Sequence, residues 1–338
     1  MKVISTGLFL LLFQFVNAQF DFGALDQYLQ KNQKQLGNNV VALVWKDGKL
    51  VYQKELGEFN AKTQAPIGAS SQWLTAALVM TFVDQGKLDL DEPVNTYLPI
   101  FNKYMKSYVT LRHCLTHTTG IEREPRISSK LMERKKYESL EEEVNAIAAK
   151  EISNNPQKEF FYGGYGFSIA ARVCEIVGKK TFDRLMQERI TRPLRMKGTN
   201  FSNENGGAPN PGAGAQSTAN DYINFMSMIL NKGMFEGKRI LSEAALAEMH
   251  KAQYADLPVK YLPTAVNGMS CGLGAWIAEA DDKGNATIVS SPGFFGCYPI
   301  ISLKKNYAAV LLSKSLLNEQ KKELTNMFAA IIDETIGQ

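Results

Sequence analysis

The chain has little of several features that define common protein classes. Its 338 residues include only four cysteines and three histidines, and no two cysteines form a Cys-x-x-Cys pair. This excludes a small disulfide-framework protein and leaves no zinc or redox motif of that kind. Lysine and arginine number 38 against 34 acidic residues, a net charge of +4 with no long basic run. We therefore expect neither nucleic acid nor an anionic membrane as the main partner.

Long apolar runs are missing beyond the N-terminus. An apolar run, residues 7–16, follows Lys2. Its last residue begins the segment Val16-Asn17-Ala18. A run of this length is too short for a membrane span, which needs about 20 residues. The layout predicts a signal peptide over residues 1–18, with a buried N-terminal helix as the alternative. We expect an exported protein, periplasmic or secreted, with a mature chain of residues 19–338.

Apolar periodicity predicts strands near both ends of the chain and helices between them. A hydrophobic fraction of 45% is ordinary for a globular protein and supports a sizeable core. The predicted helices are 22–36, 72–85, 111–117 with Thr110 as cap, 139–151 with a capping box at Ser139, 166–177, 182–190, 218–230 and 317–336. The predicted strands are 40–45 and 50–56 around Asp47-Gly48, then 272–278, 287–291, 297–303 and 308–312, with a loop at 203–214.

This order indicates an α+β fold in one beta-sheet domain. We expect an antiparallel sheet built from residues 22–60 and 265–338, with a helical region, residues 61–264, inserted between. Cys114 and Cys174 lie in apolar helical patterns, which favours buried thiols. Cys271 and Cys297 flank late strands and are the better candidates for a disulfide.

Six segments carry a resemblance to a known family. They are residues 67–77 (IGASSQWLTAA), 78–99, 110–120 (TLRHCLTHTTG), 161–164 (FYGG), 189–196 (RITRPLRM) and 216–222 (QSTANDY). Together they resemble the serine beta-lactamase-related family, which includes class C beta-lactamases, DD-peptidases and esterases, over about residues 25–335. The resemblance implies an antiparallel sheet flanked by helices, an all-helical subdomain and a cleft between them.

The nucleophile motif of that family, Ser-x-x-Lys, is absent from its expected position. Alignment on Trp73 places the family serine at Ala69 and the family lysine at Gln72. A serine hydroxyl needs a neighbouring base to become a nucleophile, and a lysine three residues on lies one helical turn away. Ser70 and Ser71 have no lysine at that spacing. Ser302 and Lys305 do, but they are expected at the end of a strand.

Two further family motifs are altered. The Tyr-x-Asn motif reads Tyr162-Gly163-Gly164, which keeps the tyrosine and loses the amide. The Lys-Thr-Gly or His-x-Gly motif matches Ser291-Pro292-Gly293, followed by Phe294, so that a hydroxyl replaces the cation or imidazole. The resemblance implies ligand contacts at Tyr162, Gly164, Ser291, Gly293 and Phe294. A packing role for Tyr162 and a plain strand-to-turn corner at Ser291 are the alternatives.

No metal or cofactor is expected. His113 and His117 are four residues apart on a predicted helix, but the residues between them lack the glutamate of the zinc-protease pattern. The tryptophans Trp45, Trp73 and Trp276 are expected in the core or in the cleft wall rather than as a sugar platform.

Three classes of function remain. The loss of both nucleophile and base favours a catalytically inactive relative that binds a small molecule or peptidoglycan-like ligand in the former cleft. An active serine hydrolase would need a relocated nucleophile, Ser70 or Ser291 with Tyr162. A purely structural protein would need no cleft residues, and the pattern at Tyr162 and Gly293 argues against it.

Overall fold

The computed structural model of the chain describes residues 20–121, 137–201, 206–254, 256–314 and 319–337. The predicted signal peptide, residues 1–18, lies outside the described residues, which begin at Phe20. Among the described helices, none is long and apolar enough to cross a membrane. The α+β fold with an antiparallel sheet, expected from the order of elements, is confirmed.

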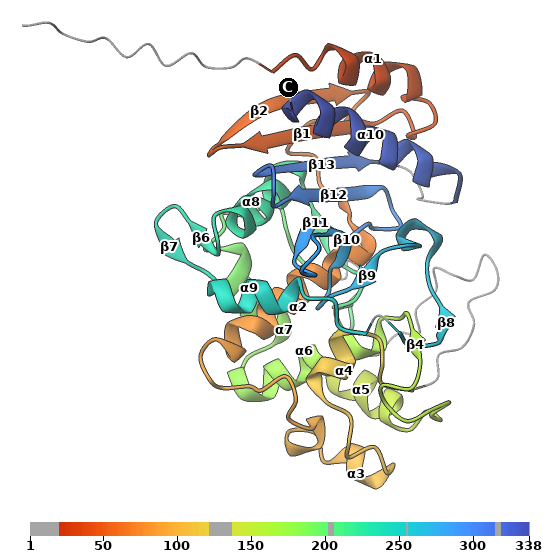
Figure 1. Cartoon of the computed structure of the whole chain (residues 1–338). Coiled ribbons are helices and arrows are strands. Elements are labelled where there is room, and N and C mark those ends of the chain that lie inside the picture. The colour runs from red at the N-terminus through yellow and green to blue at the C-terminus, as the bar shows by residue number, and fades with distance from the viewer. Residues whose placement is uncertain (1–19, 122–136, 202–205, 255, 315–318, 338) are drawn as a thin grey trace, which may run out of the picture.

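A seven-stranded sheet draws its strands from both ends of the chain, in the order β2-β1-β13-β12-β11-β10-β9 (Figure 1). Every neighbouring pair is antiparallel. The strands are β1 (Val40–Lys46), β2 (Lys49–Leu56), β9 (Ser270–Cys271), β10 (Trp276–Ala280), β11 (Ala286–Ser290), β12 (Cys297–Ser302) and β13 (Tyr307–Ser313).

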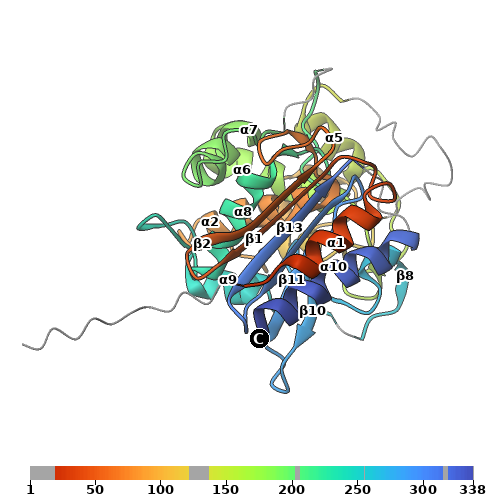
Figure 2. The same ribbon diagram turned by 90° about the horizontal axis from the view of Figure 1, so that it is seen from above.

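Helices cover both faces of this sheet. Because successive side chains of a strand point to opposite faces, Ala42 and Val44 of β1 pack with Leu25 and Leu29 on one side. Val41 and Leu43 of the same strand pack into the larger core on the other side. The first face carries α1 (Gly23–Asn32) and α10 (Glu319–Gly337), which lie across the strands in Figure 2. Burial on both faces explains why β1, β12 and β13 read as nearly continuous apolar runs.

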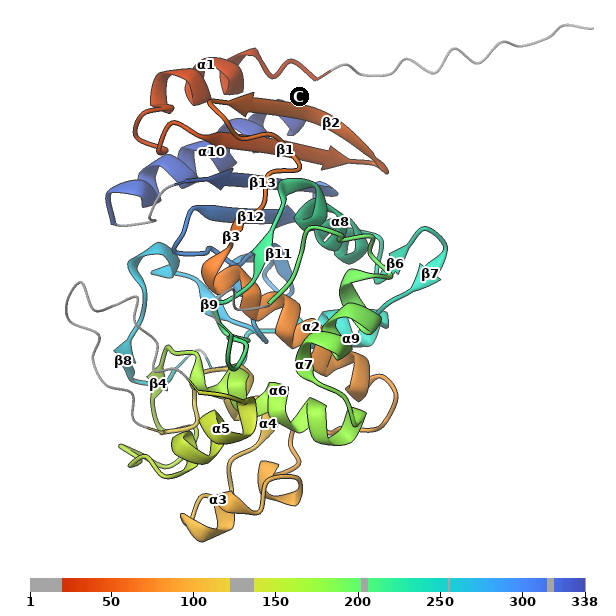
Figure 3. The same cartoon turned by 180° about the vertical axis from the view of Figure 1, so that it is seen from behind.

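The helical region lies against the second face, with α2 (Ser71–Val83) at its centre (Figure 3). All residues from Ser71 to Phe82 are buried. The surrounding helices are α3 (Ile100–Lys103), α4 (Leu111–Leu115), α5 (Leu140–Ala148), α6 (Tyr165–Gly178), α7 (Phe182–Met186) with the π-helical η4 (Gln187–Thr191), α8 (Ala219–Leu230) and α9 (Glu243–Met249). Short 3-10 helices are η1 (Gly68–Ser70), η2 (Val94–Thr96) and η5 (Thr264–Val266).

Three two-stranded pairs connect these elements. They are β3 (Ala65–Pro66) with β5 (Gln216–Ser217), β4 (Phe160–Phe161) with β8 (Val259–Tyr261), and β6 (Met234–Phe235) with β7 (Lys238–Arg239). The pair of β4 and β8 is parallel. It joins the helical region to the segment that leads back into the sheet, and it borders the candidate site.

Several sequence expectations need correction. The first helix ends at Asn32 and continues in turns, although Leu36 remains buried. The strand predicted over 272–278 begins only at Trp276 of β10; residues 272–275 form the turn between β9 and β10, in which Gly274 has a φ of +69°. The disulfide expectation for Cys271 and Cys297 was wrong, because all four cysteines are free and buried. For Cys114 and Cys174, buried thiols are confirmed, and burial raises the pKa of each.

Candidate functional site

The site is built on the first turn of α2, where the chain passes from η1 into the central helix. Ala69 is partly exposed, whereas the three residues after it are buried. Residues three apart on a helix lie one turn from each other, so Ala69 and Gln72 are neighbours on one side of the turn. The side chain of Gln72 is only 4% exposed, and its Nε2 donates a hydrogen bond of 3.1 Å to the Tyr162 hydroxyl.

The two serines beside Ala69 are committed to the framework. The Ser70 hydroxyl donates to the main-chain oxygen of Ser291 at 2.6 Å, and Ser70 is fully buried. The Ser71 hydroxyl donates to the Gly68 carbonyl at 2.5 Å and accepts from the Ala215 N–H at 3.0 Å. Both hydroxyl groups therefore hold the start of α2 against its neighbours.

The segment after β11 closes on η1 and brings the third motif to the site. The Gly293 N–H donates to the Cys297 carbonyl at 2.7 Å, and a methyl group on Gly293 would overlap the Ile67 carbonyl oxygen. This close approach requires a residue without a side chain. The Ser291 side chain is buried and its hydroxyl donates to the Gly274 carbonyl at 3.3 Å, whereas Phe294 is 46% exposed.

Tyr162 follows β4 and is held by main-chain bonds from both sides. Its N–H donates to the Tyr261 carbonyl at 3.1 Å, and the N–H of the preceding residue, Phe161, donates to the His117 carbonyl at 3.0 Å. The Tyr162 ring lies 4.6 Å from the His117 ring and 5.9 Å from that of Trp276, centroid to centroid. Tyr162 is thus the contact between Gln72 and a group of aromatic rings.

Gly164 stands where the family motif has an amide side chain. It is the residue before α6 and has a right-handed φ of −94°. A methyl group placed on it would meet no atom within 4 Å. The loss of the amide is therefore not enforced by crowding among the described residues.

His113 and His117 do not converge on a common point. The Nδ1 atom of His113 accepts from the Thr110 N–H at 3.1 Å, and its Nε2 lies 2.8 Å from Gln157. His117 Nδ1 accepts from the Gly163 N–H at 3.2 Å. Burial lowers the pKa of His113 to about 4, which keeps the ring neutral at physiological pH. Across the described part of the chain, no group of three or more His, Cys, Asp or Glu side chains could hold a metal ion.

The second Ser-x-x-Lys match is a turn, as expected from its place at the end of a strand. The Lys305 N–H donates to the Ser302 hydroxyl at 3.2 Å, and Lys305 Nζ pairs with Asp333 at 2.6 Å. The lysine is therefore tied to α10 and does not act on the serine.

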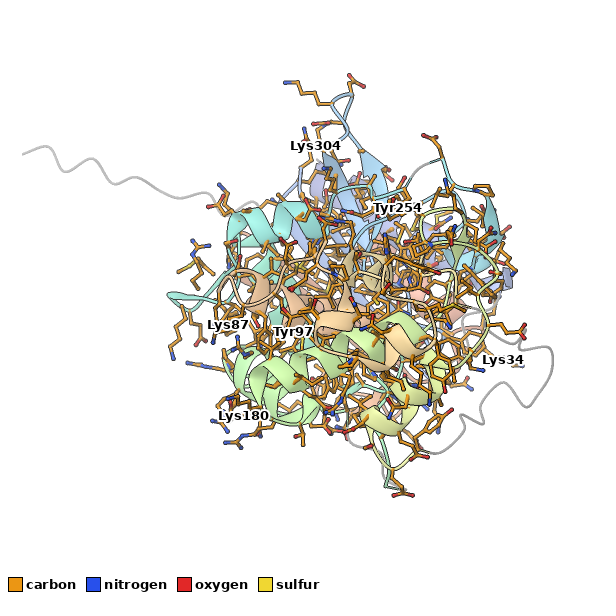
Figure 4. The ribbon with its side chains drawn as sticks, turned by 90° about the horizontal axis from the view of Figure 1, so that it is seen from below. Lys34, Lys87, Tyr97, Lys180, Tyr254 and Lys304 are labelled. Carbon is orange, nitrogen blue, oxygen red and sulfur yellow. The ribbon has the colours of Figure 1, made fainter. Side chains whose placement is uncertain are left out.

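A separate hollow of about 590 Å³ lies at the other end of α2. Lys87 and Tyr97, labelled in Figure 4, are among its lining residues. Several of its polar groups are paired: the Tyr97 hydroxyl donates to Glu92 at 2.6 Å, and Arg112 binds both carboxylate oxygens of the neighbouring Asp91, at 2.6 and 2.8 Å. We find no feature there that selects a ligand.

Sequence reasoning missed one contributor to the site, Tyr261 of β8. Its ring lies 6.4 Å from that of Tyr162 and it is 50% exposed. In the sequence, the strand is marked only by Val259 and Tyr261 on either side of a lysine. A pattern of three residues is too short to predict a strand. Trp276, expected in the core or cleft wall, is buried beside Tyr162.

The sheet, the central helix and the position of the site define a protein of the beta-lactamase and transpeptidase fold class. The chain belongs to the beta-lactamase family, whose profile matches residues 25–334. A solved structure from Bacteroides dorei DSM 17855, which carries the provisional designation of beta-lactamase, is 28% identical. It superposes with a TM-score of 0.84 over 94% of this chain and 100% of that one.

Two curated relatives have named activities. The D-alanyl-D-alanine-carboxypeptidase/endopeptidase AmpH of Escherichia coli K12 is 22% identical over 336 residues, covering 90% of this chain and 86% of that protein. The teichoic acid D-alanine hydrolase of Staphylococcus aureus is 26% identical over 188 residues, covering 53% of this chain and 44% of that protein. The family is therefore one of serine hydrolases.

Proposed function

We propose that this chain is an exported, catalytically inactive member of the beta-lactamase family that binds a small-molecule or cell-wall-type ligand where its relatives carry out catalysis. The observation that carries the proposal is the first turn of α2. Ala69 is the partly exposed residue at the nucleophile position, and Gln72 at the base position is bonded to Tyr162.

Acyl transfer of this kind needs a hydroxyl group and a group that can take its proton. A methyl side chain at Ala69 offers no nucleophile. The amide of Gln72 is not basic near neutral pH, and its N–H already donates to the Tyr162 hydroxyl. Nucleophile and base act as a unit in such sites, so the loss of both removes the chemical step.

The alternative is an active serine hydrolase with a relocated nucleophile, Ser70 or Ser291 with Tyr162. Both serines are buried, and both hydroxyls donate to main-chain carbonyls. Freeing such a hydroxyl would leave a buried acceptor without its partner, which costs about 1–3 kcal/mol. The turn would also have to move, because Gly293 packs directly against Ile67. These contacts support the inactive form over the alternative.

The names of two relatives support the kind of ligand. One is named a D-alanyl-D-alanine-carboxypeptidase/endopeptidase and the other a teichoic acid D-alanine hydrolase. The predicted signal peptide over residues 1–18 would place this chain in the compartment of such material.

Turnover measurements test the proposal. The mature chain would be assayed with a chromogenic cephalosporin and with p-nitrophenyl acetate, beside the E. coli relative as an active control. We expect rates equal to the uncatalysed background. Turnover that disappears in Ser70→Ala or in Ser291→Ala would instead establish the relocated nucleophile, and the unaffected variant of the two would serve as the matched control.

A further inference from the structure

A row of aromatic rings leads from the former active-site position to the protein surface. Its inner end is Trp276, whose ring centroid lies 5.9 Å from that of Tyr162. Tyr162 lies 6.4 Å from Tyr261, and Tyr261 lies 6.3 Å from Phe161. The row follows the β4 and β8 pair, which Figure 1 shows beside the helical region. Because Tyr162 also contacts Gln72, the row passes beside the lost catalytic residues.

Exposure increases along this row from Trp276 to Tyr261. Trp276 is 4% exposed, Tyr162 is partly exposed and Tyr261 is 50% exposed. Val259, two residues before Tyr261 on β8, is 58% exposed. The position of Tyr261 is fixed because its carbonyl accepts the Tyr162 N–H at 3.1 Å. A half-exposed ring held by the main chain offers a flat apolar contact at little conformational cost.

The residues that occupy the family motif positions in the described part of the chain carry no Asp, Glu, Lys or Arg side chain. The side chains at these positions are the methyl of Ala69, the amide of Gln72, the phenol of Tyr162, the hydroxyl of Ser291 and the ring of Phe294. A carboxylate that lost its water here without a cationic partner would be strongly destabilised.

Among the described residues, a pair of opposite charges lies beside the outer end of the row. Lys260 Nζ lies 5.1 Å from the Phe161 ring centroid and 3.8 Å from a Glu159 oxygen. The two opposite charges partly offset each other beside the rings. An uncharged ligand with one apolar face and many hydrogen-bonding groups fits both the row and the amide and phenol groups at its inner end.

We propose that the ligand of this site is a neutral oligosaccharide, whose sugar ring stacks on Tyr261 while its hydroxyl or amide groups reach Gln72 and Tyr162. The inference rests on the proposed function, because it assumes a non-catalytic binding site. It selects the saccharide part of a cell-wall-type ligand over a peptide ending in a carboxylate. Sugar rings present C–H groups on one face, and these pack well on aromatic rings.

Isothermal titration calorimetry of the mature chain tests this inference. The probes are N,N′,N″-triacetylchitotriose and maltotriose, with diacetyl-L-lysyl-D-alanyl-D-alanine as the carboxylate-bearing comparator. We expect saturable binding of at least one trisaccharide with a Kd of about 1 mM or tighter. Binding should be unchanged between low and high salt, because no charge pair is involved.

Two tyrosine variants separate stacking from general surface effects. Tyr261→Ala should weaken trisaccharide binding at least about fivefold, since it removes the stacking ring. Tyr108→Ala removes another exposed tyrosine, 39% exposed and in the segment between α3 and α4, and should leave binding unchanged. Circular dichroism would establish that both variants are folded.

Three results would overturn the inference: no saturable binding of either trisaccharide, an equal loss in both variants, or tighter binding of the peptide that is insensitive to Tyr261→Ala. Failure of the proposed function has a different signature, a covalent adduct on a serine. If the protein forms no adduct and also fails to bind either saccharide, only this inference is contradicted, and the proposed function is not.

Discussion

Restoring the two lost side chains should restore weak acylation. We predict that Ala69→Ser combined with Gln72→Lys folds and is acylated slowly by a reactive beta-lactam or ester. The rest of the turn is in place, because Ser70 and Ser71 anchor the start of α2 through their own hydrogen bonds. The new hydroxyl and amine would lie one helical turn apart, beside Tyr162.

The main energetic term is the new amine. Gln72 is 4% exposed, so a lysine there would lose most of its hydration. Burial of this kind would lower the pKa of the new amine and would cost several kcal/mol of stability. A domain with a stability of about 5–15 kcal/mol can absorb such a loss and remain folded. The same burial favours the neutral amine, which is the form that can accept the serine proton.

The repaired site should remain poor. Gly164 offers no amide and Ser291 offers no cation or imidazole. Loss of one positioned donor lowers a rate by about 10²–10³, so we expect acylation slower than in an active relative by at least that factor. The rate should rise with pH as the new lysine deprotonates. Each single variant should remain unlabelled, because nucleophile and base act together.

Intact-mass spectrometry after incubation with a fluorophosphonate or a beta-lactam gives the readout, and circular dichroism confirms the fold of each variant. Adding Ser70→Ala to the double variant is the matched control and should leave the adduct in place. A folded double variant that forms no adduct, under conditions that label an active relative, would refute the reasoning.

Three other predictions concern export, pH and the start of α6. Exported material should lack residues 1–18, and N-terminal sequencing that finds Met1 would refute this. His250 is buried with no hydrogen-bond partner at Nε2, and burial lowers its pKa from 6.5 to about 4. The unfolded chain therefore binds the proton more readily, so the free energy of unfolding should decrease as the pH is lowered from 6.5 to about 4. His250→Phe should reduce that decrease by up to about 3 kcal/mol in denaturant titrations. Gly164→Asn should leave stability nearly unchanged, because a side chain there meets open space at its first atom. Gly166→Ala should cost about 1–3 kcal/mol, because the new methyl group would overlap the Cys114 carbonyl. Equal shifts of the melting temperature in the two variants would contradict this.

Elements defined by local chemistry could be predicted from the sequence. The Thr110 hydroxyl caps α4 and the Ser139 hydroxyl caps α5, because each accepts an N–H of its helix's first turn. The hairpin around Asp47-Gly48 joins β1 and β2 as expected, with both residues at positive φ. Helix α9 was missed although Ser242 before a run of good helix formers was an available signal.

Features that depend on distant contacts could not be predicted. The strand expected at 272–278 is broken because Gly274 turns close to the Gln72 carbonyl, where a methyl group would come within 2.5 Å of the oxygen. The positions of Ala69 and Gln72 follow from the sequence. That Ser70 is bonded to Ser291, 221 residues away, and that Tyr261 joins the site, follow only from the tertiary structure.

The central claim is that no serine of this chain is acylated. The most direct test is the intact mass of the wild-type mature chain after prolonged exposure to a fluorophosphonate and to a beta-lactam, with the E. coli relative labelled in parallel. Because Ala69 has no hydroxyl and Ser70 and Ser291 are buried and hydrogen-bonded, we predict an unchanged mass. A stoichiometric mass increase that peptide mapping assigns to a serine would contradict the account.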